Sequence, residues 1–112
     1  MLRFAHPSSP GLQLNLALLD ISATGCALQQ PSGAPALVAG TEIEQVEVEL
    51  DEQTYLFTDM SIAHVSLSQS AGSRKLRVGC RWRNMPSSAK EVLERWIGNG
   101  RRRRDLISLN FD

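Results

Sequence analysis

The sequence predicts an all-β fold with one C-terminal helix: a six-stranded antiparallel small β-barrel capped by an α-helix. Apolar and polar residues alternate through most of residues 12–83, which is the period of strands with one buried face. After Pro86 the apolar residues recur at helical spacing instead. Helices do not alternate with strands, so the sheet is expected to be antiparallel, and a small barrel with a helix across one end is its natural closure.

Chain length and composition fit one domain. The chain has 112 residues, of which 42% are hydrophobic and 21% charged, so one core is expected and disorder is not. We expect a single domain over residues 1–112. It divides into an N-terminal arm at residues 1–11, a barrel at residues 12–83, a C-terminal helix with a basic end at residues 88–104 and a tail at residues 105–112.

Six segments of the barrel have strand-like alternation. The arm before them contains Pro7 and Pro10 and is expected to be irregular. Ile43 is offset by one from the alternation that begins at Val46, which indicates a bulge or a pairing that begins after Glu44. The expected strands are residues 12–18, 25–29, 42–50, 54–58, 62–67 and 75–83.

The C-terminal helix is expected to begin at Ser88. Ser88 and Glu91 have the spacing of a capping box. Gly98 and Gly100 are expected to weaken or end the helix. Its apolar residues recur at helical spacing: Val92, Leu93, Trp96 and Ile97.

The charge distribution restricts the class of partner. With 12 basic and 12 acidic residues the formal net charge is zero, so a whole-surface attraction to nucleic acid or membrane is not expected. Acidic residues concentrate at residues 42–52 and basic ones at residues 74–104. Apolar runs stay well below the roughly 20 residues of a membrane span, and the start lacks a signal-peptide core, so a cytoplasmic protein without membrane insertion is expected.

We expect neither a catalytic residue nor a metal or cofactor site. Cys26 and Cys80 each follow a glycine within an apolar run, which is typical of buried, reduced thiols rather than of a disulfide or a metal site. The two histidines, His6 and His64, do not lie beside a nucleophile motif. The sequence also lacks a phosphate loop, a dinucleotide fingerprint and a metal-ligand cluster, so the protein is not expected to be an enzyme.

The candidate binding site is the turn Asp20-x-Ser22-x-x-Gly25, which lies between two apolar, strand-like runs. It offers a carboxylate, a hydroxyl and a glycine at which the polar edge of a ligand could approach the backbone closely. The alternative is an Asx-type turn whose side chains bond only their own backbone.

In combination, these features resemble the PilZ domain, a family of small β-barrels that bind the bacterial messenger cyclic di-GMP. Asp20, Ser22 and Gly25 match the family's second ligand signature, Asp/Asn-x-Ser-x-x-Gly. The run Val-Gly-Cys-Arg-Trp at residues 78–82, the Asn-Met-Pro that follows and the amphipathic helix resemble the end of the flagellar-brake type of PilZ protein. The resemblance implies a six-stranded barrel with a C-terminal helix, cyclic di-GMP as a ligand rather than a cofactor, and a role in bacterial signalling, motility or biofilm formation.

The family's first signature, Arg-x-x-x-Arg, is matched by Arg3 alone. Arg3 precedes Phe4 as the second arginine of the signature would, and its partner would lie before Met1. In the family this segment wraps over the ligand, where the planar guanidinium groups meet phosphates and guanine edges. The resemblance implies that Arg3 binds the ligand together with the turn, and that ordering of the arm changes the surface shown to a partner. A solvated arginine is the alternative.

The resemblance also implies roles for the other matched residues. Asp20 would accept the N1–H and N2–H₂ donors of a guanine, because a carboxylate satisfies that edge with two bonds. Ser22 would bind a phosphate or a guanine group, and Gly25 would let the turn pass close to the ligand. Trp82, or the guanidinium group of Arg81 or Arg83, could stack on a base, although the alternation of residues 76–82 favours a place in the core for Trp82.

The leading hypothesis is a receptor or adaptor that binds cyclic di-GMP and signals by contact with an unknown effector protein of the motility, secretion or polysaccharide machinery. The second is a degenerate PilZ-like interaction module that does not bind cyclic di-GMP. The third is a nucleic-acid-binding barrel that uses the four arginines at residues 101–104. The protein is neutral overall and no aromatic residues are interleaved with these arginines, which is not the pattern of a nucleic-acid-binding surface. We therefore expect no nucleic-acid partner.

Overall fold

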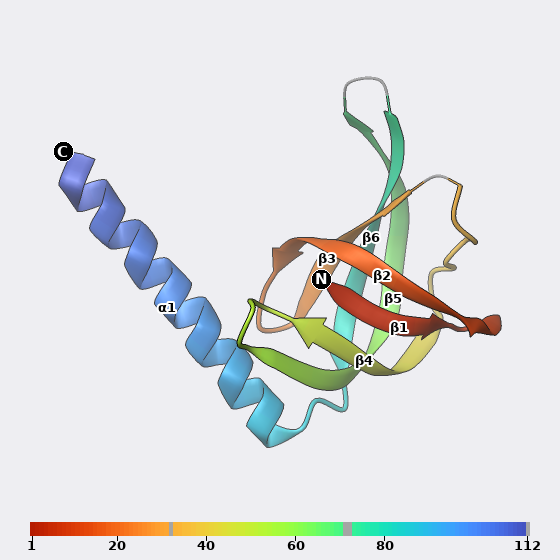
Figure 1. Cartoon of the computed structure of the whole chain (residues 1–112), viewed down its shortest axis with the longest axis horizontal. Coiled ribbons are helices and arrows are strands. Elements are labelled where there is room, and N and C mark those ends of the chain that lie inside the picture. Colours follow the sequence, from red (N-terminus) through yellow and green to blue (C-terminus); the bar gives the residue numbers. More distant parts are fainter. Residues whose placement is uncertain (32, 71–72, 112) are drawn as a thin grey trace.

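The computed structural model describes the backbone of residues 1–31, 33–70 and 73–111, and the side chains within these ranges except those of residues 68–74 and 100–111. Six antiparallel strands form a closed barrel in the order β1-β2-β3-β6-β5-β4, and a helix follows them (Figure 1). The predicted fold class is therefore confirmed. The elements are β1 (Leu2–His6), β2 (Ser9–Ile21), β3 (Gly25–Pro31), β4 (Glu42–Glu49), β5 (Tyr55–Ser70), β6 (Ser73–Arg83) and α1 (Ser87–Phe111).

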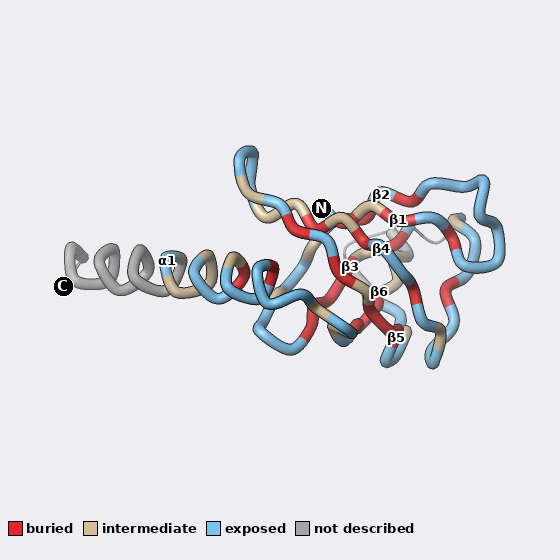
Figure 2. The backbone as a smooth tube through the Cα atoms, turned by 90° about the horizontal axis from the view of Figure 1, so that it is seen from below, coloured by how far each residue is buried: buried red, intermediate tan, exposed pale blue. Residues whose placement is uncertain are grey.

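The barrel encloses an apolar core to which five of the strands contribute fully buried side chains. Neighbouring residues of a strand point to opposite faces of the sheet, so alternate residues enter the barrel. Figure 2 shows the buried residues inside the barrel and along the first turns of α1. Side chains that are at most 1% exposed include Leu2 and Phe4 of β1, Leu28 of β3, Val46 and Val48 of β4, Met60 and Ile62 of β5, and Val78 of β6.

The structure differs from the expected irregular arm at residues 1–11. Strand β1 pairs with β2 and, through Leu2 and Arg3, with β4, so this segment closes the barrel. The prolines do not prevent this pairing, because Pro7 lies in the turn before β2 and Pro10 is an exposed residue near the start of β2. Alternation over only five residues was too short a signal to outweigh the two prolines.

Strand β5 replaces two predicted strands, residues 54–58 and 62–67. Its register against β6 shifts between Ile62 and His64, so Ala63 is an extra residue on β5. Such a bulge changes which residues face inward without ending the strand. The predicted number of six strands is correct because β1 replaces the strand lost by this merger.

A second bulge, predicted from the offset of Ile43, is confirmed in β4. The pairing of β4 with β5 shifts between Ile43 and Val46, and both side chains are buried. Gln45 lies within the bulge at a φ of 55°, and its N–H donates to Asp59 Oδ1 at 3.1 Å. The bulge therefore brings both apolar residues to the inner face of the strand.

Helix α1 is longer than the predicted range of residues 88–104, and its backbone continues through the expected tail to Phe111. Gly98 and Gly100 do not end it, because each glycine costs only about 1 kcal/mol relative to alanine and the arginines that follow are good helix formers. Within the described part of the chain, no helix is both long enough and apolar enough to cross a membrane.

The first half of α1 is held against the barrel. Ala89 and Leu93 are buried. Trp96 Nε1 donates to Oδ2 of Asp51, which lies in the β4–β5 turn, at 3.1 Å. Asp51 also accepts the Gln53 N–H at 2.9 Å. Hydrogen bonds lower the pKa of the Asp51 carboxyl, first the one from the Gln53 N–H and then those from Thr54 and Trp96. The stability that these bonds add is therefore lost as the pH falls through this lowered pKa.

Shortening Leu93 tests whether docking of the helix stabilises the barrel. Leu93 is fully buried, so Leu93→Ala should lower the free energy of unfolding by about 2–5 kcal/mol, the usual cost of deleting a buried leucine. Lys90→Ala, at an exposed position of the same helix, should change it by less than about 0.5 kcal/mol. Urea unfolding measures both values. Equal stabilities for the two variants would show that the helix does not pack as described.

Candidate functional site

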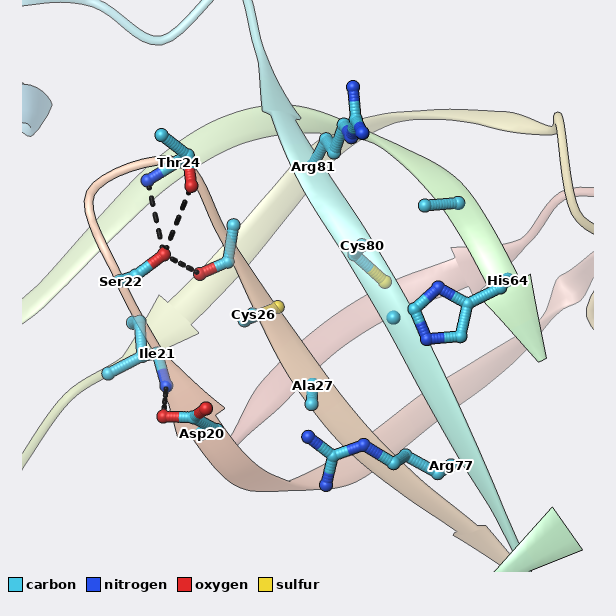
Figure 3. A pocket seen from close by; sticks show the side chains of 13 residues that line it. Asp20, Ile21, Ser22, Thr24, Cys26, Ala27, His64, Arg77, Cys80 and Arg81 are labelled. Atoms are coloured by element: carbon cyan, nitrogen blue, oxygen red, sulfur yellow. Dashed lines mark hydrogen bonds between the residues drawn. The ribbon is translucent and has the colours of Figure 1, made fainter. Parts of the chain in front are cut away.

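An open pocket of about 310 Å³ lies on the outer side of the barrel (Figure 3). Three parts of the chain form it: the β2–β3 turn with the start of β3, the middle of β5, and the second half of β6. Three predicted site residues line the pocket: Asp20 at the end of β2, Ser22 in the β2–β3 turn and Gly25 at the start of β3.

The turn is held by hydrogen bonds centred on Ser22. Its N–H donates to the Gly25 carbonyl oxygen at 2.8 Å, and its Oγ accepts the Thr24 N–H at 3.3 Å. Asp20 Oδ1 accepts the Ile21 N–H at 2.9 Å. The side chains thus stabilise their own turn, as the alternative interpretation expected. They also remain exposed at the pocket, so self-bonding does not prevent contact with a ligand.

The structure explains why residue 25 is a glycine, which the sequence alone did not indicate. A Cβ atom at this residue would lie 2.1 Å from the Cys80 carbonyl oxygen on the neighbouring strand β6. Real Cβ contacts are essentially never below 3.0 Å, so only glycine permits this approach of the two backbones. Glycine is therefore required here by strand pairing, whether or not a ligand lies nearby.

A second close approach places His64 in the pocket. His64 of β5 lies opposite Gly79 of β6, and a Cβ atom on Gly79 would lie 2.3 Å from His64 Cε1. The imidazole therefore lies against the backbone of β6 with its ring exposed at the pocket (Figure 3). The sequence analysis did not assign His64 to the site, because the bulge at Ala63 that sets its direction is not visible in the sequence pattern.

Two arginines of β6 complete the pocket. Arg77 and Arg81 are two residues on either side of Gly79, so all three face the same side of the sheet. Both side chains are exposed, and among the described residues neither forms an ion pair. The pocket thus combines cationic groups on β6 with the carboxylate of Asp20 on the turn.

The other two predicted site residues, Arg3 and Trp82, are not among the residues that line the pocket. Arg3 of β1 forms ion pairs with Glu47 at 2.5 Å and with Glu49 at 2.8 Å, and hydrogen bonds to these carboxylates raise the pKa of Arg3. Trp82 is half-buried against the core, and its Nε1 donates to the Ser22 carbonyl oxygen at 3.0 Å. Trp82 therefore supports the β2–β3 turn.

The two cysteines meet where β3 pairs with β6, and both also line the pocket. Cys26 and Cys80 are partners in the pairing of β3 with β6, and both thiols are free and buried, as predicted. The hydrogen bond with Cys80, together with burial, raises the pKa of the Cys26 thiol. Among the described side chains no cluster of histidine, cysteine, aspartate or glutamate is suited to hold a metal ion. The side chains of the predicted basic end, residues 101–104, lie outside the described residues.

Comparison with known families agrees with this architecture. The family model described as PilZ domain matches residues 3–99, which include β1 from Arg3 onward, the other five strands and the docked part of α1. The chain belongs to the PilZ domain family. The match includes the turn from Asp20 to Gly25 and the β6 residues of the pocket.

Two curated relatives of this PilZ domain are both named flagellar brake protein YcgR. The one from Methylibium petroleiphilum is 38% identical over 104 residues, which is 93% of this chain and 45% of the relative. The one from Leptothrix cholodnii is 32% identical over 110 residues, which is 97% of this chain and 42% of the relative. The chain therefore spans less than half the length of these relatives.

Solved structures share the fold at low sequence identity. The PilZ domain with c-di-GMP of YcgR from Escherichia coli has a TM-score of 0.79 at 20% identity, with 96% of this chain and 86% of that chain covered. The K. pneumonia MrkH–c-di-GMP complex has a TM-score of 0.75 at 17% identity, with 91% of this chain and 48% of that chain covered. Both support the barrel and its helix.

An added methyl group at Gly25 tests the close pairing of β3 with β6. Gly25→Ala should lower the free energy of unfolding by about 3 kcal/mol or more, because the Cβ atom meets backbone that cannot move aside independently. Gly11→Ala is the matched control, since nothing lies within 4 Å of its Cβ position. Thermal unfolding of both variants checks the difference. If Gly25→Ala is as stable as Gly11→Ala, the described approach of the strands is wrong.

Proposed function

We propose that this PilZ domain is a receptor module that binds cyclic di-GMP in the pocket between the β2–β3 turn and β6. It then signals by contact with an effector protein and does not turn over a substrate. The observation that carries the proposal is the meeting of Asp20 and Ser22 with His64, Arg77 and Arg81 in one pocket. The two solved neighbours described above were determined with c-di-GMP, which supports the same class of ligand.

The chemistry of the pocket suits a guanine dinucleotide. Asp20 is an acceptor for the N1–H and N2–H₂ donors of one guanine, since only one of its oxygens is occupied within the described part of the chain. Arg77 and Arg81 present planar guanidinium groups to phosphate oxygens or to the O6 and N7 edge of guanine. The Ser22 hydroxyl lies within the same pocket, and it can donate to a ligand by releasing its 3.4 Å bond to the Gly25 carbonyl oxygen.

Arg3 and Trp82 take different parts in the proposal. Arg3 can reach a ligand only if it leaves Glu47 and Glu49, so its contribution requires two ion pairs to break. Trp82 acts through the turn, because its indole N–H holds the Ser22 carbonyl group. We therefore propose direct ligand contact for the pocket residues, and a positioning role for Trp82.

The place of this module in the cell follows from the same proposal. Cyclic di-GMP is a bacterial messenger, so the receptor would act in the cytoplasm. The names of the relatives, flagellar brake protein, favour an effector in motility over the secretion or polysaccharide machinery. The degenerate interaction module is less favoured, because the pocket retains a carboxylate, a hydroxyl and two arginines in suitable places.

Calorimetric titration of cyclic di-GMP into the whole chain tests the proposal. Saturable binding is expected, and Asp20→Ala should weaken it at least about tenfold, as the loss of a bidentate contact to guanine predicts. Arg77→Ala with Arg81→Ala should weaken it as well and should reduce its dependence on salt. Arg3→Ala should have the smallest effect of these changes.

Glu44→Ala, an exposed residue of β4 that is not part of the pocket, is the control and should bind as the unchanged chain does. Absence of binding heat at high ligand concentration would reject the receptor proposal and favour the ligand-independent module. Equal affinities for the unchanged chain and Asp20→Ala would show that the ligand binds somewhere other than the described pocket.

A further inference from the structure

Two aromatic side chains are exposed on the outer face of β5, away from the pocket. Tyr55 is 61% and Phe57 52% exposed, although tyrosine and phenylalanine usually bury most of their surface in a small domain. Their rings contact each other edge to face, with centroids 5.9 Å apart. Exposed aromatic residues that form a patch are typical of protein interfaces rather than of an inert surface.

The strands beside this pair carry carboxylates. On β4, Glu49 lies opposite Tyr55 and Glu47 lies opposite Phe57, so the four side chains share one face of the sheet. On β1, Arg3 lies opposite Glu47 and forms ion pairs with both glutamates. We call this surface the acidic–aromatic face, defined by Arg3, Glu47, Glu49, Tyr55 and Phe57.

The surroundings of the acidic–aromatic face are strongly negative. Residues 42–59 contain seven of the chain's 12 acidic residues and no lysine, arginine or histidine. Among the described residues, Arg3 is the only cation that forms ion pairs with this segment. Although the whole chain is formally neutral, this side of the barrel therefore attracts cations and repels anions at short range.

The acidic–aromatic face and the ligand pocket lie on different sides of the barrel. In the closed order β1-β2-β3-β6-β5-β4, β1 stands opposite β6 and β4 stands opposite β3. The pocket is built on β3, β6 and the middle of β5 at Ala63 and His64, whereas the aromatic pair lies at the start of β5. An occupant of the face therefore does not compete with a ligand in the pocket.

We propose that the acidic–aromatic face docks a segment of a partner protein in which arginine or lysine residues alternate with apolar ones. Guanidinium groups stack on Tyr55 and Phe57 and bond the carboxylates of Glu47 and Glu49, while the apolar residues cover the rings. An anionic membrane, a nucleic acid or an acidic peptide is repelled by the same carboxylates. The inference extends the proposed receptor function by giving the effector a contact surface, and its test does not require that cyclic di-GMP bind.

Fluorescence anisotropy with synthetic peptides tests this inference on the whole chain. The probe is a labelled peptide of alternating arginine and leucine, and the matched peptide has glutamate in place of arginine. The arginine peptide should bind and the glutamate peptide should not, and the binding should weaken as salt is added. Equal binding of the two peptides, or binding that salt leaves unchanged, would overturn the charge argument.

A pair of variants locates the binding. The double variant Tyr55→Ser and Phe57→Ser should lower the affinity for the arginine peptide at least about tenfold, as expected for aromatic anchor residues. Leu67→Ser is the matched control, because Leu67 is 66% exposed on the same strand but lies outside the face, and it should leave the affinity unchanged. Circular dichroism and thermal unfolding confirm that both variants fold. An unchanged affinity in the aromatic variant would overturn the proposal.

Two further readouts separate this inference from neighbouring explanations. Light scattering over a range of concentrations should show no self-association that depends on Tyr55 and Phe57. Such self-association would identify a second copy of this chain as the occupant of the face. It would then overturn the proposal of a basic partner. The peptide titration is repeated with saturating cyclic di-GMP. If the chain binds the peptide but not cyclic di-GMP, the docking proposal for the acidic–aromatic face is supported and the receptor function is rejected. Failure of one proposal can therefore be told apart from failure of the other.

Discussion

Strands β3 and β6 approach each other so closely at Gly25 that a Cβ atom there would lie 2.1 Å from the Cys80 carbonyl oxygen. The pairing of these two strands runs without a register shift from Gly25 to Pro31, whereas four of the other five pairs contain a register shift and the fifth covers only two residues. It joins the hairpin of β2 and β3 to that of β5 and β6, and the pairing of β1 with β4 then closes the barrel. The pocket depends on the same contact, because it holds the turn beside β6.

The chemistry of the pocket follows from strand alternation and one glycine. Arg77, Gly79 and Arg81 face outward together, and the missing side chain at Gly79 leaves space for the His64 ring. The inward residues between them, Val78 and Cys80, belong to the core. One strand thus supplies both part of the core and the cationic side of the pocket, while the acidic residues gather across the barrel on β4.

The sequence was sufficient for the elements with long, regular alternation and for the turn at Asp20. It was not sufficient for β1, whose five residues are too short a pattern beside two prolines, nor for the bulge at Ala63 that joins two predicted strands into β5. The pocket residues His64 and Arg77 were missed for a related reason. Which residues of distant strands meet depends on register, and register is set by bulges and close backbone contacts that a single sequence does not display.

Backbone amide chemical shifts of the ¹⁵N-labelled chain, recorded during addition of cyclic di-GMP, test the central claim most directly. We expect the largest shifts in three separate segments of the sequence: the turn from Asp20 to Gly25, His64 on β5, and Arg77 to Arg81 on β6. Smaller shifts are expected at Glu47 and Tyr55, on the far side of the barrel. Shifts confined to β1 and β4, or no shifts at all, would contradict the proposal that this pocket binds the messenger.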